Sequence, residues 1–186
     1  GLMATATANG QIVHCVTATK GEAGVQNAVK WPAAALGETR TKEQEAAMQI
    51  LGVPEPTWLT YHDGECEKVP EAEAIGQIGQ IIELHKPDTV ITFAPDGLTG
   101  HPDHKAVSHW TTEAVKKSGH NVNLYYAVQT QESYDAFWHV VDEKFNVYFA
   151  TDNPAFRQQN SCDVLLLLEP DIAARKTKAL KAMPSQ

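Results

Sequence analysis

The sequence predicts an α/β fold with a Rossmann-like, mostly parallel sheet and helices on both faces. Short runs of apolar and β-branched residues alternate along the chain with longer segments that have a helical period. Glycine-containing turns follow several of these runs, as they do at the carboxyl ends of parallel strands. No Gly-x-Gly-x-x-Gly or Gly-Lys-Ser/Thr loop follows a predicted strand, so the sequence does not support a nucleotide-binding Rossmann domain.

Strands are predicted where short runs are rich in apolar and β-branched residues and are bounded by turn residues. These runs are Gln11–Thr17, Thr57–Tyr61, Thr89–Ala94, Asn123–Gln129, Asn146–Ala150 and Cys162–Leu168.

Helices are predicted where apolar residues recur with a period near 3.6 and a start or stop signal follows. Such segments are Gly1–Asn9, Glu71–His85, Pro102–Lys117, Ser133–Val141 and Asp171–Met183. A further helix is predicted from Thr39 or Thr41, either of which can serve as its cap, to about Leu51, where Gly52 ends it. Val25–Glu38, which precedes it, has few periodic apolar positions and is predicted to be mainly loop.

Composition narrows the class of protein. With 186 residues, the chain is predicted to form a single domain over residues 1–186. Its net charge of −8 argues against nucleic acid or an anionic membrane surface as the main partner. The longest apolar run, Val164–Leu168, is far shorter than the roughly 20 residues of a membrane span. The three cysteines are widely spaced without a Cys-x-x-Cys pair, which predicts reduced thiols and a cytoplasmic location.

The stretch Thr89–His104 is the strongest candidate for a functional site. It reads as a buried strand, a glycine-rich loop and the start of a helix, with Pro102 suited to the first helical position. Open α/β sheets place their active sites at such carboxyl ends of strands. The alternative is purely structural: His101 caps the helix, Asp103 interacts with the helix dipole and His104 lies on the surface.

His101 and His104 are three residues apart, so on a helical turn they point in a similar direction. Neutral imidazole is a zinc ligand, and a catalytic zinc takes three protein ligands and a water molecule. A second histidine beside the metal can act as a general acid, and Asp103 can orient a histidine. Because this short segment cannot supply a full ligand set, further ligands must come from elsewhere.

Three residues outside this stretch are also candidates. Glu22 follows a predicted strand, where a functional acid and a solvated loop acid are equally compatible with the sequence. His62 also lies at a strand end, from which it could reach a site. Arg40 lies at the predicted start of a helix, where a cation is disfavoured, so it needs solvent or a polar partner and is a candidate for ligand binding.

These residues resemble the LmbE/PIG-L family of zinc-dependent N-deacetylases, which act on N-acetylglucosamine-type sugars. Pro95–His104 is similar to the second signature of the family, which ends in His-Pro-Asp-His. Lys20–Gly24 is similar to the loop after its second strand, and Arg40–Gly64 to its next helix and turn. The closing Ala182–Gln186 resembles the His-x-Ser-Gln ending of the family, although Met183 replaces the usual histidine.

The resemblance implies a role for each matching residue. His104 is the metal ligand, His101 stabilises the tetrahedral intermediate and protonates the leaving amine, and Asp103 orients the histidine pair. Arg40 binds the sugar and Asp63 holds substrate hydroxyls. Thr99 stands where some members carry a tyrosine that assists at the oxyanion. The implied cofactor is Zn²⁺, although a His₂Asp site also accepts Fe²⁺.

The first signature of the family, His-Pro-Asp-Asp-Glu, is absent from the sequence. In the family it follows the first strand and supplies a histidine ligand, an aspartate ligand and the aspartate general base. Its expected place is just upstream of Gly1, which agrees with the helix tail predicted at Gly1–Asn9. We therefore expect the sequence to be truncated at both ends.

The resemblance implies a metal-dependent hydrolase that removes an acetyl group from an N-acetylated amino sugar or sugar conjugate. The alternative is a non-catalytic sugar-binding protein of the same fold, because one metal ligand is too few for catalysis. The expected partner is a small N-acetylated sugar, with no nucleic acid and no membrane span, and homo-oligomer formation stays open. The exact substrate cannot be identified from the sequence.

Overall fold

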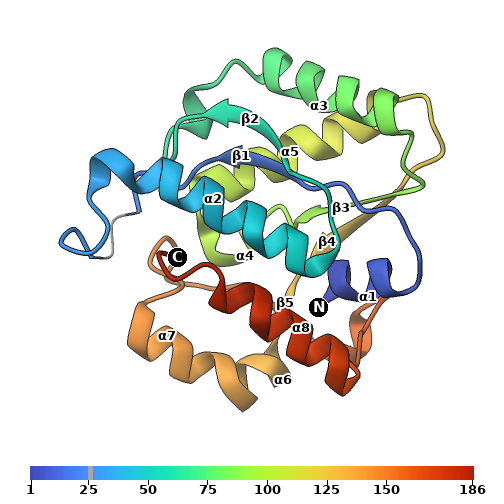
Figure 1. Cartoon of the computed structure of the whole chain (residues 1–186). Helices are drawn as coiled ribbons and strands as arrows, with labels where there is room; N and C mark the ends of the chain where they lie inside the picture. Colours follow the sequence, from blue (N-terminus) through green and yellow to red (C-terminus); the bar gives the residue numbers. More distant parts are fainter. Residues whose placement is uncertain (25–26) are drawn as a thin grey trace. The chain divides into compact units, whose positions relative to one another are not determined.

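A computed structural model describes residues 1–24 and 27–186, and it divides the chain into two compact units. Unit 1 comprises Gly1–Asp63 and Leu165–Gln186, and unit 2 comprises Gly64–Val164. Helices alternate with short strands in both units (Figure 1), and the strand pairs of the described residues are parallel. The predicted α/β class is therefore confirmed, while the single domain over residues 1–186 stays a prediction.

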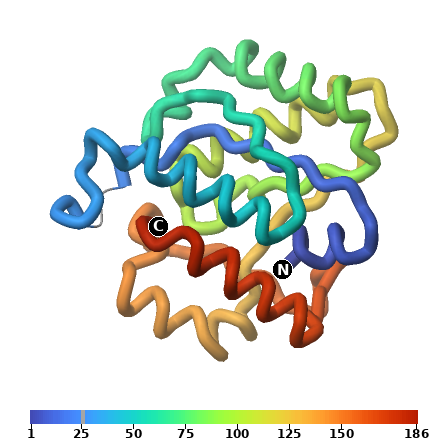
Figure 2. Tube along the Cα trace, in the orientation of Figure 1, coloured from blue at the N-terminus to red at the C-terminus, as the bar shows by residue number. Residues whose placement is uncertain are grey.

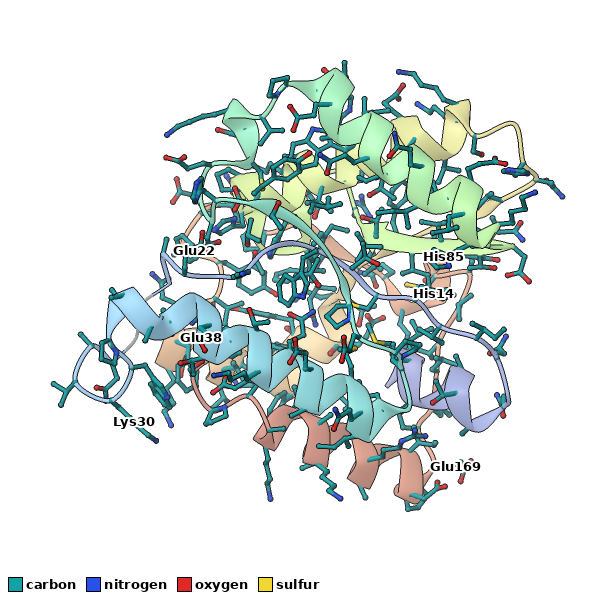
Figure 3. All side chains as sticks on the ribbon, turned by 45° about the horizontal axis from the view of Figure 1, so that its top comes forward. His14, Glu22, Lys30, Glu38, His85 and Glu169 are labelled. Atoms are coloured by element: carbon teal, nitrogen blue, oxygen red, sulfur yellow. The ribbon has the colours of Figure 1, made fainter. Side chains whose placement is uncertain are left out.

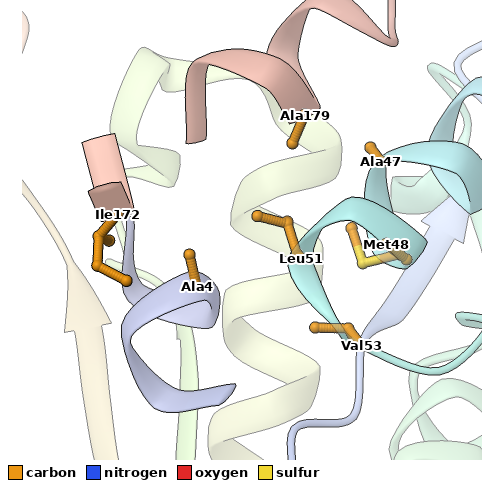
Figure 4. Packing of buried hydrophobic residues seen from close by; sticks show 7 residues of the cluster. All are labelled: Ala4, Ala47, Met48, Leu51, Val53, Ile172 and Ala179. Atoms are coloured by element: carbon orange, nitrogen blue, oxygen red, sulfur yellow. The ribbon is translucent and has the colours of Figure 1, made fainter. Parts of the chain in front are cut away.

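Unit 1 is built on a parallel β–α–β connection. Strand β1 (Val16–Thr19) pairs with β2 (Thr57–Tyr61), and α2 (Ala33–Leu51) lies between them in sequence. Helices α1 (Leu2–Ala8) and α8 (Pro170–Lys181) both contact α2, and the path of the chain through all three can be followed in Figure 2. Figure 4 shows the apolar cluster that joins them, formed by Ala4, Ala47, Met48, Leu51, Val53, Ile172 and Ala179.

Unit 2 has a second parallel pair, formed by β3 (Thr89–Phe93) and β4 (Asn123–Ala127) in register along their whole length. Helix α5 (Pro102–Lys117) connects these strands and packs against α3 (Glu71–His85). Between β3 and α5 the chain makes the short turn α4 (Gly97–Gly100). The buried apolar side chains of α3 and α5 are Ala74, Ile75, Ile78, Ile82, Trp110 and Ala114.

The rest of unit 2 is made of short elements. They are η1 (Cys66–Lys68), β5 (Gln129–Thr130), α6 (Gln131–Ser133), the π-helical η2 (Tyr134–Trp138), α7 (His139–Phe145), β6 (Phe156–Arg157) and η3 (Gln159–Ser161). Strands β5 and β6 pair in parallel. The rings of Tyr134, Tyr148 and Phe156 lie within 4.5 to 5.9 Å of one another and pack these elements together.

Several predicted elements are confirmed with their boundaries. Glu71–His85 and Pro102–Lys117 are helices over the predicted residues, and Thr57–Tyr61 is a strand. Their ends carry strong local signals, such as Pro102 at the first helical position. The apolar pattern of α3 would also place Leu84 on its buried face, but this residue is 76% exposed.

The predicted start of α2 is wrong. The helix begins at Ala33, after the extended Pro32, and its end at Gly52 (φ +70°) is as predicted. Thr39 and Thr41 do not cap it, because each hydroxyl donates to the carbonyl four residues earlier, at 2.9 and 2.8 Å. Threonine makes this bond inside a helix as readily as it caps one, and the sequence does not distinguish the two uses. Residues 25–26 of the predicted loop lie outside the described residues.

Three predicted strands are wrong in whole or in part. Gln11–Cys15 precedes the strand, and β1 begins only at Val16. Asn146–Ala150 forms turns after α7, with Asn146 at a φ of +49°. Cys162–Leu168 contains no strand, and Val164 to Leu167 are between 40% and 88% exposed. A strand needs a hydrogen-bonded partner, and composition alone does not show whether one is present.

The early start of α2 brings Leu36 into the helix, where its side chain is buried, with 1% of its surface exposed. We therefore expect Leu36→Ala to lower the free energy of unfolding by about 2–5 kcal/mol, measured by urea denaturation. The matched control is Leu180→Ala on α8 of the same unit, whose side chain is 55% exposed and whose loss should cost less than about 1 kcal/mol. Equal losses for the two variants would contradict the burial of Leu36.

Candidate active site

The candidate site in unit 2 follows the carboxyl end of β3. Asp96 and the short turn α4 lead into α5, whose first residues carry the predicted functional side chains. The rings of His101 and His104 have centroids 5.0 Å apart. The structure therefore brings His101, Asp103 and His104 together at the predicted place, the start of a helix after a strand.

His104 is held by its neighbours in an orientation that suits a metal ligand. Its ring stacks on Phe93 with centroids 4.0 Å apart and an interplanar angle of 7°. Its Nδ1 lies 3.0 Å from the carbonyl oxygen of Gly97. Because a carbonyl only accepts hydrogen bonds, we infer that Nδ1 carries the proton and that the lone pair of the neutral ring is on Nε2. A backbone carbonyl commonly fixes the tautomer of metal-binding histidines in this way.

His101 has the opposite arrangement. Its Nδ1 accepts a hydrogen bond from the backbone N–H of Asp103 at 3.2 Å and so caps α5. The neutral ring must then carry its proton on Nε2, where it can be donated. Phe149 contacts the ring edge-on, with centroids 5.8 Å apart. The capping role that the sequence allowed for His101 is thus present, and it leaves the neutral ring with a hydrogen-bond donor at Nε2.

Asp103 is buried, with 5% of its surface exposed. Its two carboxylate oxygens accept hydrogen bonds from the backbone N–H groups of Gly64 at 2.7 Å and of Cys66 at 3.1 Å. These bonds tie the turn before α3 to the first turn of α5. Asp103 contacts His101 through its backbone N–H and not through its carboxylate. Orientation of the two histidines by the Asp103 carboxylate therefore stays a prediction.

Arg40 does not lie at the start of a helix, as predicted, but in the interior of α2, with 6% of its surface exposed. Its guanidinium donates to the carbonyls of Gly21, of Gly24 at 2.8 Å and of Ser185 at 2.9 Å, all in unit 1. Its Nε is buried without a hydrogen-bond partner among the described residues. The reason that singled out Arg40 therefore does not hold, and its contact with a sugar stays a prediction.

The glycines of the Gly21–Gly24 loop leave room for the Arg40 guanidinium. A Cβ atom on Gly21 would lie 2.6 Å from Nη1 of Arg40, and one on Gly24 would lie 3.0 Å from it. Gly21 also has a φ of +69°, which disfavours other residues. The segment Lys20–Gly24, which is similar to a loop of the family, thus forms a loop that surrounds the buried Arg40 guanidinium.

Glu22, Asp63 and His62 lie together where β1 and β2 end, and Glu22 is labelled in the loop after β1 in Figure 3. The Asp63 carboxylate accepts from the Thr19 hydroxyl at 3.3 Å and from the Ala23 N–H at 3.0 Å. Glu22 Oε1 accepts from the Asp63 N–H at 3.1 Å and lies 3.5 Å from His62 Nδ1. Asp63 thus anchors this loop, and its contact with substrate hydroxyls stays a prediction.

The sequence did not single out two polar residues that organise these regions. Glu43 accepts from the backbone N–H of Ser185 at 3.2 Å and from its hydroxyl at 2.6 Å, one helical turn after Arg40. Asp96 accepts from the backbone N–H of Leu98 at 2.7 Å. The available signals were the Arg40-x-x-Glu43 spacing and the Pro95-Asp96-Gly97 sequence, which is typical of a turn.

The described residues contain no group of three or more His, Cys, Asp or Glu side chains arranged to hold a metal ion. His104 supplies one candidate ligand, whereas a catalytic zinc takes three protein ligands. The predicted substrate residues Arg40 and Asp63 belong to unit 1, and His101, Asp103 and His104 belong to unit 2.

The Glu22 carboxylate makes the stability of unit 1 dependent on pH. Burial opposes its ionisation, but hydrogen bonds from backbone N–H groups and from His62 outweigh burial and lower its pKa below the usual 4.5. Because the unfolded chain then binds more protons, this contribution is present above about pH 4.5 and is lost as the pH falls through the lowered pKa.

We therefore expect Glu22→Gln to be less stable than the wild type near neutral pH and to lose less unfolding free energy between about pH 6 and pH 3. Urea titrations across this range measure the difference. Glu55→Gln, which changes an exposed carboxylate of the same unit, should keep the wild-type slope. An unchanged slope for Glu22→Gln would be inconsistent with the hydrogen bonds described for this carboxylate.

Comparison with known proteins identifies the family of the chain. Residues 1–115 match the family described as GlcNAc-PI de-N-acetylase (PIG-L). A 1D-myo-inositol 2-acetamido-2-deoxy-alpha-D-glucopyranoside deacetylase from Mycobacteroides abscessus is 34% identical over 69% of the chain and 54% of its own length. The protein of the same name from Mycobacterium sp. (strain KMS) is 29% identical over 100% of the chain and 68% of its own length. The chain thus spans about half the length of the Mycobacteroides abscessus relative.

Solved structures share the fold. The N,N'-diacetylchitobiose deacetylase from Pyrococcus horikoshii matches with a TM-score of 0.65 and 22% identity over 100% of the chain and 63% of its own. GalB, the 4-carboxy-2-hydroxymuconate hydratase from Pseudomonas putida KT2440, matches with a TM-score of 0.63 and 18% identity over 100% of the chain and 72% of its own. These names describe different reactions, so the likeness establishes the fold alone. Family membership rests on the match over residues 1–115: the chain belongs to the GlcNAc-PI de-N-acetylase (PIG-L) family.

Proposed function

We propose that the whole protein is a metal-dependent N-deacetylase that hydrolyses the acetamide of an N-acetylated amino sugar or sugar conjugate. The observation that carries the proposal is the pair of histidines at the start of α5, whose Nδ1 atoms have opposite hydrogen-bond roles. One ring presents a lone pair on Nε2 and the other a proton. Relatives named as deacetylases of an acetamido sugar conjugate support the same reaction class.

The proposed reaction adds water to the acetyl carbonyl carbon and breaks the C–N bond, which releases acetate and an amine. When bound, a divalent metal would supply activation of the water and polarisation of the carbonyl. In this scheme His104 would hold the metal, with its ring oriented by the Gly97 carbonyl at Nδ1. His101 donates a hydrogen bond from Nε2 to the tetrahedral intermediate, and its doubly protonated ring gives the Nε2 proton to the departing nitrogen.

The identity of the metal and the full ligand set belong to the proposal. The family is generally metal-dependent, and Zn²⁺ is the proposed ion, with Fe²⁺ as the alternative for a site of histidine and carboxylate ligands. Arg40 and Asp63 remain the proposed substrate-binding residues. Since the Arg40 guanidinium is buried against three carbonyls, direct contact with a sugar would require it to exchange at least one of these bonds.

The proposed setting is the cytoplasm, and the proposed partner is a small N-acetylated sugar. No disulfide joins the cysteines in the described part of the chain, which supports a reducing compartment. Across residues 1–24 and 27–186, the helices are too short or too polar to cross a bilayer.

A second candidate is a non-catalytic sugar-binding protein of the same fold. It is favoured by one observation, the lack of a complete group of metal ligands among the described residues. The two candidates differ in a measurable way, because the second binds an N-acetylated sugar without releasing acetate and without a stoichiometric metal.

The test uses the full-length protein with N,N'-diacetylchitobiose as the probe, and measures acetate release and bound metal. We expect His101→Ala to keep the metal and to lose about 10²–10⁴-fold in turnover, because a general acid contributes roughly this factor. We expect His104→Ala to lose both the metal and turnover.

The matched control is His109→Ala, on the same helix, which replaces an exposed histidine paired with Glu71 at 2.7 Å. It should retain the wild-type metal content and turnover. Wild-type deacetylation by both the His101 and the His104 variants would refute the assignment, and sugar binding without acetate release would favour the second candidate.

A further inference from the structure

We propose that Asp96 and Leu98 are positioning residues, which aim the Gly97 carbonyl at His104 and so hold this ring in its Nδ1–H tautomer. The inference rests on the proposed function for its purpose, since the Nδ1–H form leaves the Nε2 lone pair for a metal. Its physical content is a property of the loop and the ring, and this property can be measured without metal or substrate.

The turn that carries the Gly97 carbonyl has an unusual backbone. Leu98 has φ +65° and ψ −54°, a region that L-residues with a side chain rarely adopt. Gly97, just before it, has φ +76°, which a glycine adopts without strain. A strained residue of this kind persists only where its surroundings hold it, and such residues gather at functional sites.

Asp96 supplies one such restraint. Its carboxylate oxygen Oδ1 accepts a hydrogen bond from the backbone N–H of Leu98 at 2.7 Å. This N–H and the Gly97 carbonyl belong to the same planar trans peptide, so they point in opposite directions. By holding the N–H toward its own side chain, Asp96 turns the carbonyl oxygen toward His104 Nδ1, 3.0 Å away.

The packing around the turn restrains it from both ends. A Cβ atom on Gly97 would lie 3.2 Å from the Cβ of His104 and 3.0 Å from the Cγ of Lys105, so this peptide lies directly on the first turn of α5. At the other end, a Cβ atom on Gly100 would lie 2.7 Å from the Cβ of Thr151. The loop therefore has little room to relax by moving as a whole.

Thr99 also lies near His104 Nδ1, with its hydroxyl oxygen 3.4 Å away. A hydroxyl can donate or accept, so this contact is compatible with either tautomer. The Gly97 carbonyl is closer and can only accept, so it is the group that selects Nδ1–H. The proposal thus predicts different effects for the two contacts. Removal of the Thr99 hydroxyl should leave the His104 tautomer unchanged, whereas loss of the hydrogen bond between Asp96 and the Leu98 N–H should change it.

The experiment measures the tautomer of each histidine by two-bond ¹H–¹⁵N correlations on ¹⁵N-labelled protein, at a pH where the rings are neutral. We expect Nδ1–H for His104 in the wild type, in Asp96→Asn, which keeps an acceptor oxygen, and in Thr99→Ala. In Asp96→Ala, we expect Leu98 to relax to a negative φ and His104 to populate both tautomers. His101, capped onto the Asp103 N–H, is the internal control and should stay Nε2–H throughout.

The double variant Asp96→Ala/Leu98→Gly tests the mechanism by rescue. Glycine tolerates the positive φ without the Asp96 bond, so the Nδ1–H form of His104 should return at least in part. This variant and Asp96→Ser, with a shorter acceptor, keep the test available where Asp96→Ala does not fold. A purely structural role of Asp96 would predict lower stability in Asp96→Ala with an unchanged tautomer.

In the full-length protein, Asp96→Ala should weaken zinc binding by about 10–100-fold, as loss of groups that support a ligand does. The proposal is overturned where Asp96→Ala keeps His104 fully as Nδ1–H, or where Thr99→Ala alone changes it. A tautomer change as expected, in a full-length protein that neither binds zinc nor releases acetate, would refute the proposed function and leave this inference standing.

Discussion

A buried charge must be matched by hydrogen bonds, and this constraint organises both units of the structure. In unit 1 the buried cation is Arg40, whose guanidinium donates to the carbonyls of two loop glycines and of Ser185. In unit 2 the buried anion is Asp103, whose carboxylate accepts from two backbone N–H groups of the turn before α3. In each case a charged side chain on a helix satisfies backbone groups of segments that lie far away in sequence.

This constraint explains residues that otherwise appear unrelated. Gly21 and Gly24 have no side chain because the Arg40 guanidinium occupies the space. Ser185 is only 2% exposed because its carbonyl is bonded to Arg40 and its N–H and hydroxyl to Glu43, one turn along the same helix. Removing one partner of such a set leaves a buried polar group unsatisfied, which costs more than the net gain of an ordinary hydrogen bond.

The features that could be predicted from the sequence are those with local causes. Pro102 and Asp103 define the start of α5, the isoleucines of Glu71–His85 define the buried face of α3, and Thr89–Phe93 is a short β-branched strand. Features with non-local causes could not be predicted. The apolar run Cys162–Leu168 has the composition of a strand but no strand partner among the described residues, and Arg40 is bonded to a serine 145 positions away.

The same distinction applies within the candidate site. The sequence places two histidines on one helical turn, and nothing in their residue type or spacing assigns them different chemistry. The difference arises from the backbone group that faces each Nδ1: an N–H for His101 and a carbonyl for His104. A donor at Nδ1 leaves a proton on Nε2, and an acceptor at Nδ1 leaves a lone pair there. The division of roles is therefore a property of the turn around the histidines, and the backbone conformation of Gly97 and Leu98 bears on the chemistry as directly as the imidazoles do.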